Sequence, residues 1–339
     1  MPSDRALLVA AGGGIGDTLL AGVVAHALRS RFAHVEALVL PAHRAIAEHD
    51  PAIERVHLLA SPVPTAEDLR GAGFAAAVVT WATLTTALVP ALAGIPVRVG
   101  QARRLYSPLF TQRVVVRSER GDHRSHWTQI LLDYARAIDC DDPVARPTFQ
   151  PHETDRRAAD ALLAEHGIDG SFALLHPSRG LTEQRERWPA AGFIALGRSL
   201  RERDALPLLV TGTAADAAVA EAIARDAAAV SIAGATTIGT FAALAERARY
   251  VVAMDSGPMH VAAAVGAPTV GIFALQSDEP DRWAPLGPHT AVVRAIYPCP
   301  PAHRKETCPD FACVRHLDIA TIVRTLDGLL ATIPEPERL

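Results

Sequence analysis

Short apolar runs alternate along the chain with longer stretches of helical spacing. In the first half, such runs start near Ala6, Val35, Ala75 and Val97. Continuous apolar runs of this kind are typical of parallel strands that are buried on both faces. The pattern therefore predicts strands over residues 6–11, 35–40, 56–59, 75–81, 97–100 and 114–117, with helices over 18–31 and 126–138 and helical stretches between the other strands.

The alternation stops in a proline-rich stretch and then starts again. Residues 140–151 contain three prolines, which indicates a linker. After it we expect strands over 172–176, 207–211, 230–233, 250–254 and 269–273, and helices over 155–166, 190–203, 214–227, 239–248 and 319–330. Two such series predict an α/β fold of two doubly wound, parallel-sheet Rossmann-like domains facing each other across a cleft, one over 1–150 and one over 151–339. The last helix could pack back on the first domain.

The composition and charge of the chain argue against some classes of function. The chain has 339 residues, of which 49% are hydrophobic, and a net charge of −4. This charge gives no sign of a nucleic-acid partner. The N-terminus lacks the pattern of a signal peptide, and no run reaches the roughly 18 apolar residues of a membrane helix. We therefore expect a cytoplasmic protein whose cysteines are reduced.

The most informative stretch follows the strand expected over 250–254. Asp255, Ser256, Gly257 and Pro258 form the turn into an alanine-rich helix, and His260 lies in its first turn. Glycine lets a ligand approach the backbone closely, and proline at the start of a helix costs no hydrogen bond. The free N–H groups of a helix N-terminus attract phosphate. We favour a phosphate site over the alternative, a helix that Asp255 or Ser256 simply caps.

A glycine-rich loop follows the first expected strand. Its glycines resemble a dinucleotide-binding loop, but Asp17 stands where that motif needs its last glycine. No Lys-Ser or Lys-Thr pair follows, so the loop is not a nucleotide-hydrolase phosphate loop either. The residues leave two readings of Asp17 open: a helix cap, or a general base that points into the expected cleft.

Two further loops carry candidate phosphate ligands in the second domain. One contains Ser178 and Arg179, and the other contains Arg185 and Arg187 before a Trp-Pro pair. Guanidinium groups bind phosphate with two hydrogen bonds, although a solvated charged loop is the common alternative. Residues 211–213, after another expected strand, would form a wall of the same pocket.

Taken together, these segments resemble glycosyltransferase family 9, the ADP-heptose:lipopolysaccharide heptosyltransferases. The matching segments are 14–19, 176–178, 187–193, 210–213 and 255–266, in family order and over nearly the whole chain. The resemblance implies a GT-B fold with the acceptor on the first domain and the sugar nucleotide on the second. It also implies inverting transfer of heptose from ADP-heptose to a hydroxyl group, with no cofactor or essential metal. The implied acceptor is the lipopolysaccharide inner core.

The resemblance also implies roles for single residues. Asp17 would deprotonate the acceptor hydroxyl, and Asp255 would contact the sugar. One departure is Glu186, where the family usually has a lysine that neutralises the leaving phosphate; Arg185 or Arg187 would substitute for it. The expected donor and diphosphate ligands are Ser178, Arg179, Arg185, Arg187, Thr211, Gly212, Asp255, Ser256, Gly257, Pro258, Met259 and His260, and the expected acceptor-side residues are Gly14, Gly16, Thr18 and His123.

Cysteines near the C-terminus offer a different chemistry. Cys299, Cys308 and Cys313 lie in a proline-rich segment with His303 and His316, and three cysteines with a histidine can bind zinc. The spacing contains no CxxC pair, so we favour free thiols in a surface loop. Likewise, His123 and His126 could face the acceptor, but the start of a helix is the simpler reading.

Other functions remain open on the sequence alone. A relative on the same fold could use another sugar nucleotide, or a natural-product or protein acceptor. A sugar-nucleotide epimerase or hydrolase would need further acid–base residues, and a solute-binding protein would need an export signal. Residues 101–111 are basic, which suits an anionic acceptor and equally an exposed loop. An arginine-rich surface would also suit peripheral contact with the inner face of a membrane.

Overall fold

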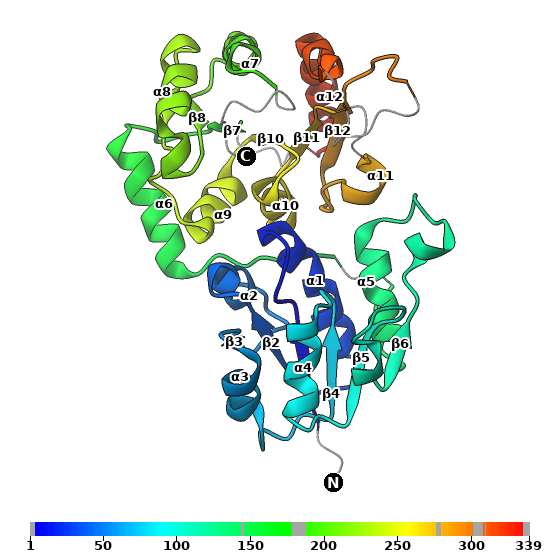
Figure 1. Cartoon of the computed structure of the whole chain (residues 1–339). Coiled ribbons are helices and arrows are strands. Elements are labelled where there is room, and N and C mark those ends of the chain that lie inside the picture. The colour runs from blue at the N-terminus through cyan, green and yellow to red at the C-terminus, as the bar shows by residue number, and fades with distance from the viewer. Residues whose placement is uncertain are drawn as a thin grey trace. The chain divides into compact units, whose positions relative to one another are not determined.

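The computed structural model describes residues 4–143, 146–177, 188–275, 279–300, 308 and 310–334. It divides into two units, Met1–Gln150 and Pro151–Leu339. Each unit is built around one six-stranded sheet with helices on both faces (Figure 1). All strand pairs in both sheets are parallel.

The sheet of the first unit has the order β3-β2-β1-β4-β5-β6. The central strand β1 pairs with β2 on one side and β4 on the other, so that Leu8 lies between Ala37 and Val78. Leu7, Leu8 and Val9 are at most 1% exposed, which explains the unbroken apolar run. The strands are β1 (Arg5–Val9), β2 (His34–Val39), β3 (Arg55–Leu58), β4 (Ala76–Val79), β5 (Val97–Gln101) and β6 (Gln112–Val114).

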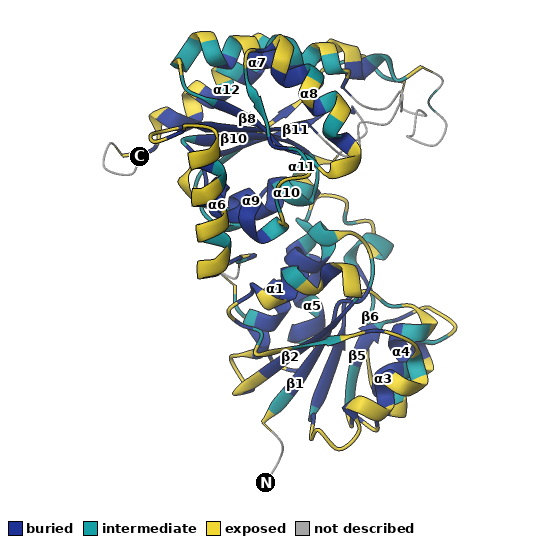
Figure 2. Ribbon diagram, turned by 90° about the vertical axis from the view of Figure 1, so that its left-hand side faces the viewer, coloured by how far each residue is buried: buried dark blue, intermediate teal, exposed yellow. Residues whose placement is uncertain are grey.

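Helices cover both faces of this sheet. Leu7 and Val9 point to the face that α3 and α4 cover, where they pack in one core with Leu69 and Val89. Helices α1 and α5 pack against each other on the other face (Figure 2). The helices of this unit are α1 (Ile15–Leu28), α2 (Arg44–Glu48), α3 (Pro62–Leu69), α4 (Leu84–Leu92) and α5 (Trp127–Arg136), with short 3₁₀ turns η1 (Pro41–His43), η2 (Ser107–Leu109) and η3 (Arg117–Arg120).

The sheet of the second unit repeats the plan, with the order β12-β11-β10-β7-β8-β9. Its strands are β7 (Ala173–His176), β8 (Leu208–Val210), β9 (Val230–Ser231), β10 (Tyr250–Met254), β11 (Thr269–Phe273) and β12 (Thr290–Arg294). Helices α7, α8 and α12 supply the core on one face, while α9 packs against α6 and α10. The helices are α6 (Glu153–Glu165), α7 (Ala190–Asp204), α8 (Ala217–Asp226), α9 (Ile238–Arg247), α10 (Gly257–Ala264), α11 (Pro280–Trp283) and α12 (Ile319–Ala331), with 3₁₀ turns η4 (Ala214–Asp216) and η6 (Ala312–His316).

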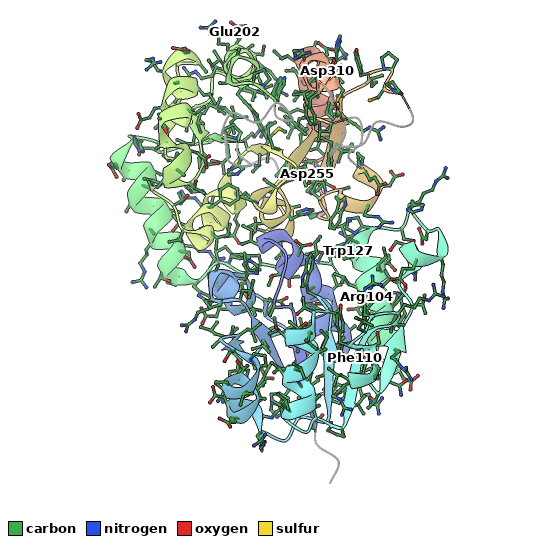
Figure 3. The ribbon with its side chains drawn as sticks, in the orientation of Figure 1. Arg104, Phe110, Trp127, Glu202, Asp255 and Asp310 are labelled. Carbon is green, nitrogen blue, oxygen red and sulfur yellow. The ribbon has the colours of Figure 1, made fainter. Side chains whose placement is uncertain are left out.

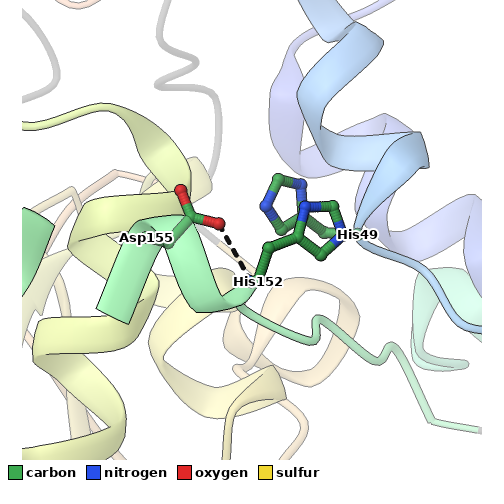
Figure 4. A group of neighbouring side chains, drawn as sticks. All are labelled: His49, His152 and Asp155. Atoms are coloured by element: carbon green, nitrogen blue, oxygen red, sulfur yellow. Dashed lines mark hydrogen bonds between the residues drawn. The ribbon is translucent and has the colours of Figure 1, made fainter. Parts of the chain in front are cut away.

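Helix α6 opens the second unit with a local capping interaction. The backbone N–H of His152 donates a hydrogen bond of 2.9 Å to Oδ2 of Asp155 (Figure 4). An acidic residue in the first turn also suits the helix dipole. The outer surface of α6 is largely exposed, and only Ala159 and Leu163 of this helix are buried (Figure 2).

Among the strands, β12 is the one that the apolar pattern failed to predict. Its sequence is Thr-Ala-Val-Val-Arg, and only one of these residues, Val293, is buried. As an edge strand it has a neighbour on one side only, so it lacks the continuous apolar run of the central strands. The final helix α12 packs on β12 and α7, within the second unit. Among the described residues, no helix combines the length and apolar character needed to cross a bilayer.

A histidine of α1 links three segments of the first unit. Nε2 of His26 lies 3.2 Å from Oδ1 of Asp50 and 2.8 Å from Oγ1 of Thr148. The hydrogen bond with Asp50 raises the pKa of His26 above its usual value, against the opposing effect of burial. The protonated ring therefore stabilises the folded unit.

This raised pKa predicts a pH dependence of stability. The contribution of His26 is complete below its unfolded-state pKa, about 6.5, and is lost as the pH rises through the higher folded-state value. The difference in unfolding free energy between the wild type and His26→Gln should therefore shrink from pH 6 to pH 8, as measured by urea denaturation. A difference that is constant with pH would contradict the assignment. Titratable groups that the wild type and the variant share contribute equally to both proteins, so they cancel in this difference of unfolding free energies.

Candidate functional site

The glycine-rich loop between β1 and α1 holds the carboxylate of Asp17. Gly14 precedes the helix with φ −96° and ψ −178°, and Asp17 is the third helical residue. Oδ2 of Asp17 accepts a hydrogen bond of 2.8 Å from the backbone N–H of Gly14. Asp17 therefore lies within the first turn of α1 and links that turn to the preceding loop. The residue that flanks the helix is Gly14. Its side chain is half-buried, and so is Gly16 beside it.

Two glycines of this loop make room for side chains and not for a pyrophosphate. A Cβ atom on Gly12 would lie 2.0 Å from Cδ1 of Trp81, so the indole ring rests directly on this backbone. Gly13 has φ +68°, and a Cβ there would lie 2.5 Å from Oδ2 of Asp17. The structure therefore explains why this loop departs from the dinucleotide-binding motif. Its glycines permit the close approach of Trp81 and Asp17.

A small cavity lies beside Asp17. Its volume is about 10 Å³, close to what one water molecule needs. The lining residues come from the ends of β1 and β4 and from α1 and α5: Ala10, Gly12, Asp17, Thr80, Trp81, Trp127 and Leu131. Trp127 is the first residue of α5 (Figure 3). The carboxyl ends of parallel strands are where α/β folds bind ligands, so this cavity places Asp17 in a chemically useful position.

Thr18 and His43 form a second polar contact next to Asp17. Thr18 is buried, and its Oγ1 lies 2.8 Å from Nδ1 of His43 at the end of η1. Burial lowers the pKa of His43 below its usual value, while the negative charge of Asp17 opposes this shift. The His43 ring is therefore neutral, and it lies close enough to Asp17 for the charge of the carboxylate to affect its pKa. His43 could not be predicted from the sequence, because it lies far from Asp17 along the chain.

Two other histidines lie around the start of α5. His123 is exposed in the loop before α5 and is not among the residues that line the cavity. His126 flanks the helix, and its Nδ1 accepts a hydrogen bond of 3.2 Å from the N–H of Thr128. The reading of His126 as a helix start is confirmed.

The turn between β10 and α10 carries the candidate phosphate site in the second unit. Asp255, at the end of β10, anchors its backbone N–H to the carbonyl of Ile272 at 2.9 Å (Figure 3). Ser256 flanks α10, but its hydroxyl donates to the carbonyl of Met254 at 3.0 Å. The Ser256 side chain therefore does not cap the helix, whose N-terminus lies at the carboxyl end of β10.

The remaining residues of this turn differ in exposure. Gly257 begins α10 and Pro258 follows as its second residue, and both are half-buried. Met259 is fully buried, where it packs so closely on Gly271 that a Cβ there would lie 2.6 Å from its sulfur. His260 is also buried. The side chain of Met259 therefore lies in the core, and its backbone N–H donates a hydrogen bond of 3.1 Å to the carbonyl of Ser256.

A buried, hydrogen-bonded pair of side chains lies at the ends of the neighbouring strands β7 and β8. Nδ1 of His176, at the end of β7, lies 2.8 Å from Oγ1 of Thr211, which follows β8. Both side chains are buried, so Thr211 orients His176. Gly212 leaves room for Asp216, whose Oδ2 accepts hydrogen bonds from the N–H and hydroxyl of Thr213. The predicted phosphate ligands Ser178, Arg179, Arg185 and Arg187, and the unusual Glu186, lie outside the described residues.

The C-terminal cysteines are free thiols, but they do not all lie on the surface. Cys299 and Cys308 are half-buried, whereas Cys313 is buried in the core of the second unit. Burial raises the pKa of the Cys299 thiol, and negative charge on Cys313 and Cys308 would add to this shift. The surface-loop reading was therefore wrong for Cys313, whose neighbour Val314 belongs to the same core. The ring of His316 lies 4.6 Å from that of Tyr297.

Comparison with known protein families gives a match over most of the chain. Residues 63–310 match the sequence profile of glycosyltransferase family 9 (heptosyltransferase). The sequence matches none of the curated proteins with which it was compared.

Solved structures share the fold over nearly their whole length. A family 9 glycosyl transferase from Veillonella parvula DSM 2008 is 16% identical, with a TM-score of 0.81 over 98% of this chain and 99% of that one. The ADP-heptose lps heptosyltransferase II of E. coli is 20% identical, with a TM-score of 0.78 over 96% and 98%. The E. coli heptosyltransferase WaaC, solved with ADP, is 17% identical, with a TM-score of 0.72 over 96% and 99%. The predicted GT-B class, with two Rossmann-like domains, is confirmed.

Proposed function

The chain belongs to glycosyltransferase family 9, and we propose that it transfers heptose from ADP-heptose to a hydroxyl group of a lipopolysaccharide inner-core acceptor. The observation that carries this proposal is the carboxylate of Asp17, which the Gly14 N–H orients beside a cavity of hydroxyl size. The sugar nucleotide and the glycan acceptor are its substrates. The reaction takes place in the cytoplasm, with peripheral contact at the inner face of the membrane.

Asp17 acts as the general base. In the described part of the chain, only Oδ2 of this carboxylate makes a hydrogen bond, so Oδ1 is available to an acceptor hydroxyl. As the acceptor oxygen attacks the anomeric carbon, Asp17 takes the hydroxyl proton and the bond to the β-phosphate of ADP breaks. Attack opposite the leaving group inverts the anomeric carbon. The neutral ring of His43 adds no positive charge next to this base.

The N-terminus of α10 receives the leaving diphosphate. The positive end of the helix dipole stabilises the charge that develops on ADP. Asp255 contacts the sugar, and an arginine from residues 185–187 adds a second positive group. In this proposal the helix and the arginine supply the charge stabilisation, and no cofactor or metal takes part.

The diphosphate assignment predicts the effect of a charge at Ser256. Asp and Asn both suit the residue that flanks a helix, and they differ by one charge, so both variants should fold. Ser256→Asp should weaken ADP binding at least about tenfold, because a carboxylate would face the diphosphate. Ser256→Asn should stay within about threefold of the wild type. Calorimetric titration with ADP checks this, and equal affinities for the Asp and Asn variants would contradict the site.

A family 9 enzyme that uses another sugar nucleotide is the second candidate. The observation in its favour is Glu186, at the position where the resemblance to family 9 implies a lysine. Calorimetry with ADP-heptose, ADP-glucose and UDP-N-acetylglucosamine separates the two. Binding of ADP-heptose alone supports the first proposal. Preference for another sugar nucleotide would overturn the donor while leaving the phosphate site in place.

A further inference from the structure

Trp81 is a large aromatic side chain that folding leaves partly in solvent. It follows β4 directly and is 38% exposed. Among the exposed large apolar residues of the described chain it is the aromatic one; the others are Leu58, Val63, Leu84, Leu92, Leu105, Val292 and Ile296. Trp188, by contrast, is 4% exposed in the core of the second unit. A single exposed apolar side chain is common on protein surfaces. Trp81 differs from the others in its position, because it lines the cavity beside Asp17.

The structure holds the Trp81 ring in place before any ligand arrives. One side of the indole rests on the backbone of Gly12, as the 2.0 Å distance to a Cβ there shows. The carbonyl of Trp81 accepts a hydrogen bond of 2.8 Å from the hydroxyl of Thr86 in α4. The next carbonyl, of Ala82, accepts one of 2.5 Å from Tyr106. A ring that is oriented in advance loses little freedom when a ligand stacks on it.

The neighbourhood of the ring suits a sugar. Trp81 and Trp127 line the same cavity as Asp17. Because this cavity is about 10 Å³, it accepts a group of the size of a hydroxyl and excludes a sugar ring. A pyranose has an apolar face of C–H groups and an edge of hydroxyl groups. Its apolar face fits on an exposed indole while one hydroxyl at its edge enters the cavity.

We propose that Trp81 is the platform on which the acceptor sugar stacks, so that one hydroxyl of that ring reaches Asp17. The inference rests on the proposed glycosyl transfer and specifies its acceptor. The acceptor is recognised by the sugar ring that carries the attacking hydroxyl. A serine or threonine of a protein, which has no such ring, would not be positioned.

Fluorescence tests the platform without any turnover. Titration of Asp17→Asn protein with deacylated inner-core oligosaccharide, in the absence of donor, should change the tryptophan emission. The same titration of an Asp17→Asn, Trp81→Phe protein should lose most of that change. An unchanged signal in the double variant, or no signal in either protein, would overturn the platform.

Kinetics test whether the platform acts on the acceptor alone. Trp81→Ala should raise the KM for the acceptor at least about fivefold, while Trp81→Phe should retain most of the affinity. Leu84→Ala removes a neighbouring exposed apolar side chain outside the cavity and should leave KM unchanged. Urea denaturation verifies that the first unit of each variant is folded. If Trp81→Ala behaves like Leu84→Ala, the platform is wrong. A fluorescence response without heptose transfer would keep the platform and overturn the proposed donor.

Discussion

Asp17→Asn should reduce kcat for glycosyl transfer by about 10²–10⁴-fold while ADP binding stays unchanged. The amide cannot take the acceptor proton. Its oxygen can still accept the hydrogen bond of 2.8 Å that the Gly14 N–H donates in the wild type. The loop and α1 should therefore keep their structure. Steady-state ADP release with saturating donor and acceptor measures the loss.

Asp155→Asn is the matched control for this variant. Asp155 occupies the corresponding position in α6, where it accepts the N–H of His152 at 2.9 Å (Figure 4). The same change of carboxylate to amide there removes a favourable charge from the first turn of a helix, which costs about 0.3–1 kcal/mol of stability. It should leave kcat unchanged. Equal effects of the two variants on kcat would show that Asp17 has only a capping role.

Gly12→Ala should destabilise the first unit by about 1–3 kcal/mol and impair transfer. The new methyl group would lie 2.0 Å from Cδ1 of Trp81, so the indole must leave its place against the loop. Because Trp81 shares a cavity with Asp17, its displacement also disturbs the candidate acceptor site. Urea denaturation gives the stability change, and the near-ultraviolet circular dichroism of tryptophan reports the displaced ring.

Gly14→Ala provides the steric control for stability. A Cβ on Gly14 would meet only Oδ2 of Asp17, at 3.7 Å, which is an ordinary contact. The φ of −96° at Gly14 is also open to alanine. The stability of this variant should fall by at most about 1 kcal/mol, because alanine suits the residue that flanks a helix less well than glycine does. If Gly12→Ala is tolerated equally well, Trp81 does not depend on the bare backbone of the loop.

Apolar patterning was sufficient to predict most of the central elements. Strands β10 and β11 have the predicted bounds, Tyr250–Met254 and Thr269–Phe273, because strands buried on both faces leave a continuous apolar run. The same rule explains why β12 was missed, since only Val293 of this edge strand is buried. Buried helices in such a fold also lack a clear polar face, so their ends shift by a few residues.

The environment of Asp17 could not be predicted in the same way. Gly12, Trp81 and Trp127 are far apart in the sequence and meet only because β4 pairs with β1 and α5 packs against α1. Strand order depends on packing between distant segments, which no local pattern encodes. Asp17 itself was identified from its position after a strand and a glycine-rich loop. The inward orientation of Met259 was hidden for a related reason, because it depends on its contact with Gly271 of β11.

The central claim is tested most directly by the products of one reaction. Wild-type protein, ADP-heptose and deacylated inner-core oligosaccharide are incubated, and ADP and the mass of the acceptor are measured together. We expect one ADP for each acceptor molecule that gains a single heptosyl unit, and neither product with Asp17→Asn. ADP release without a heptosylated acceptor, or the same products from Asp17→Asn, would contradict the proposed transfer and the role of Asp17 as its base.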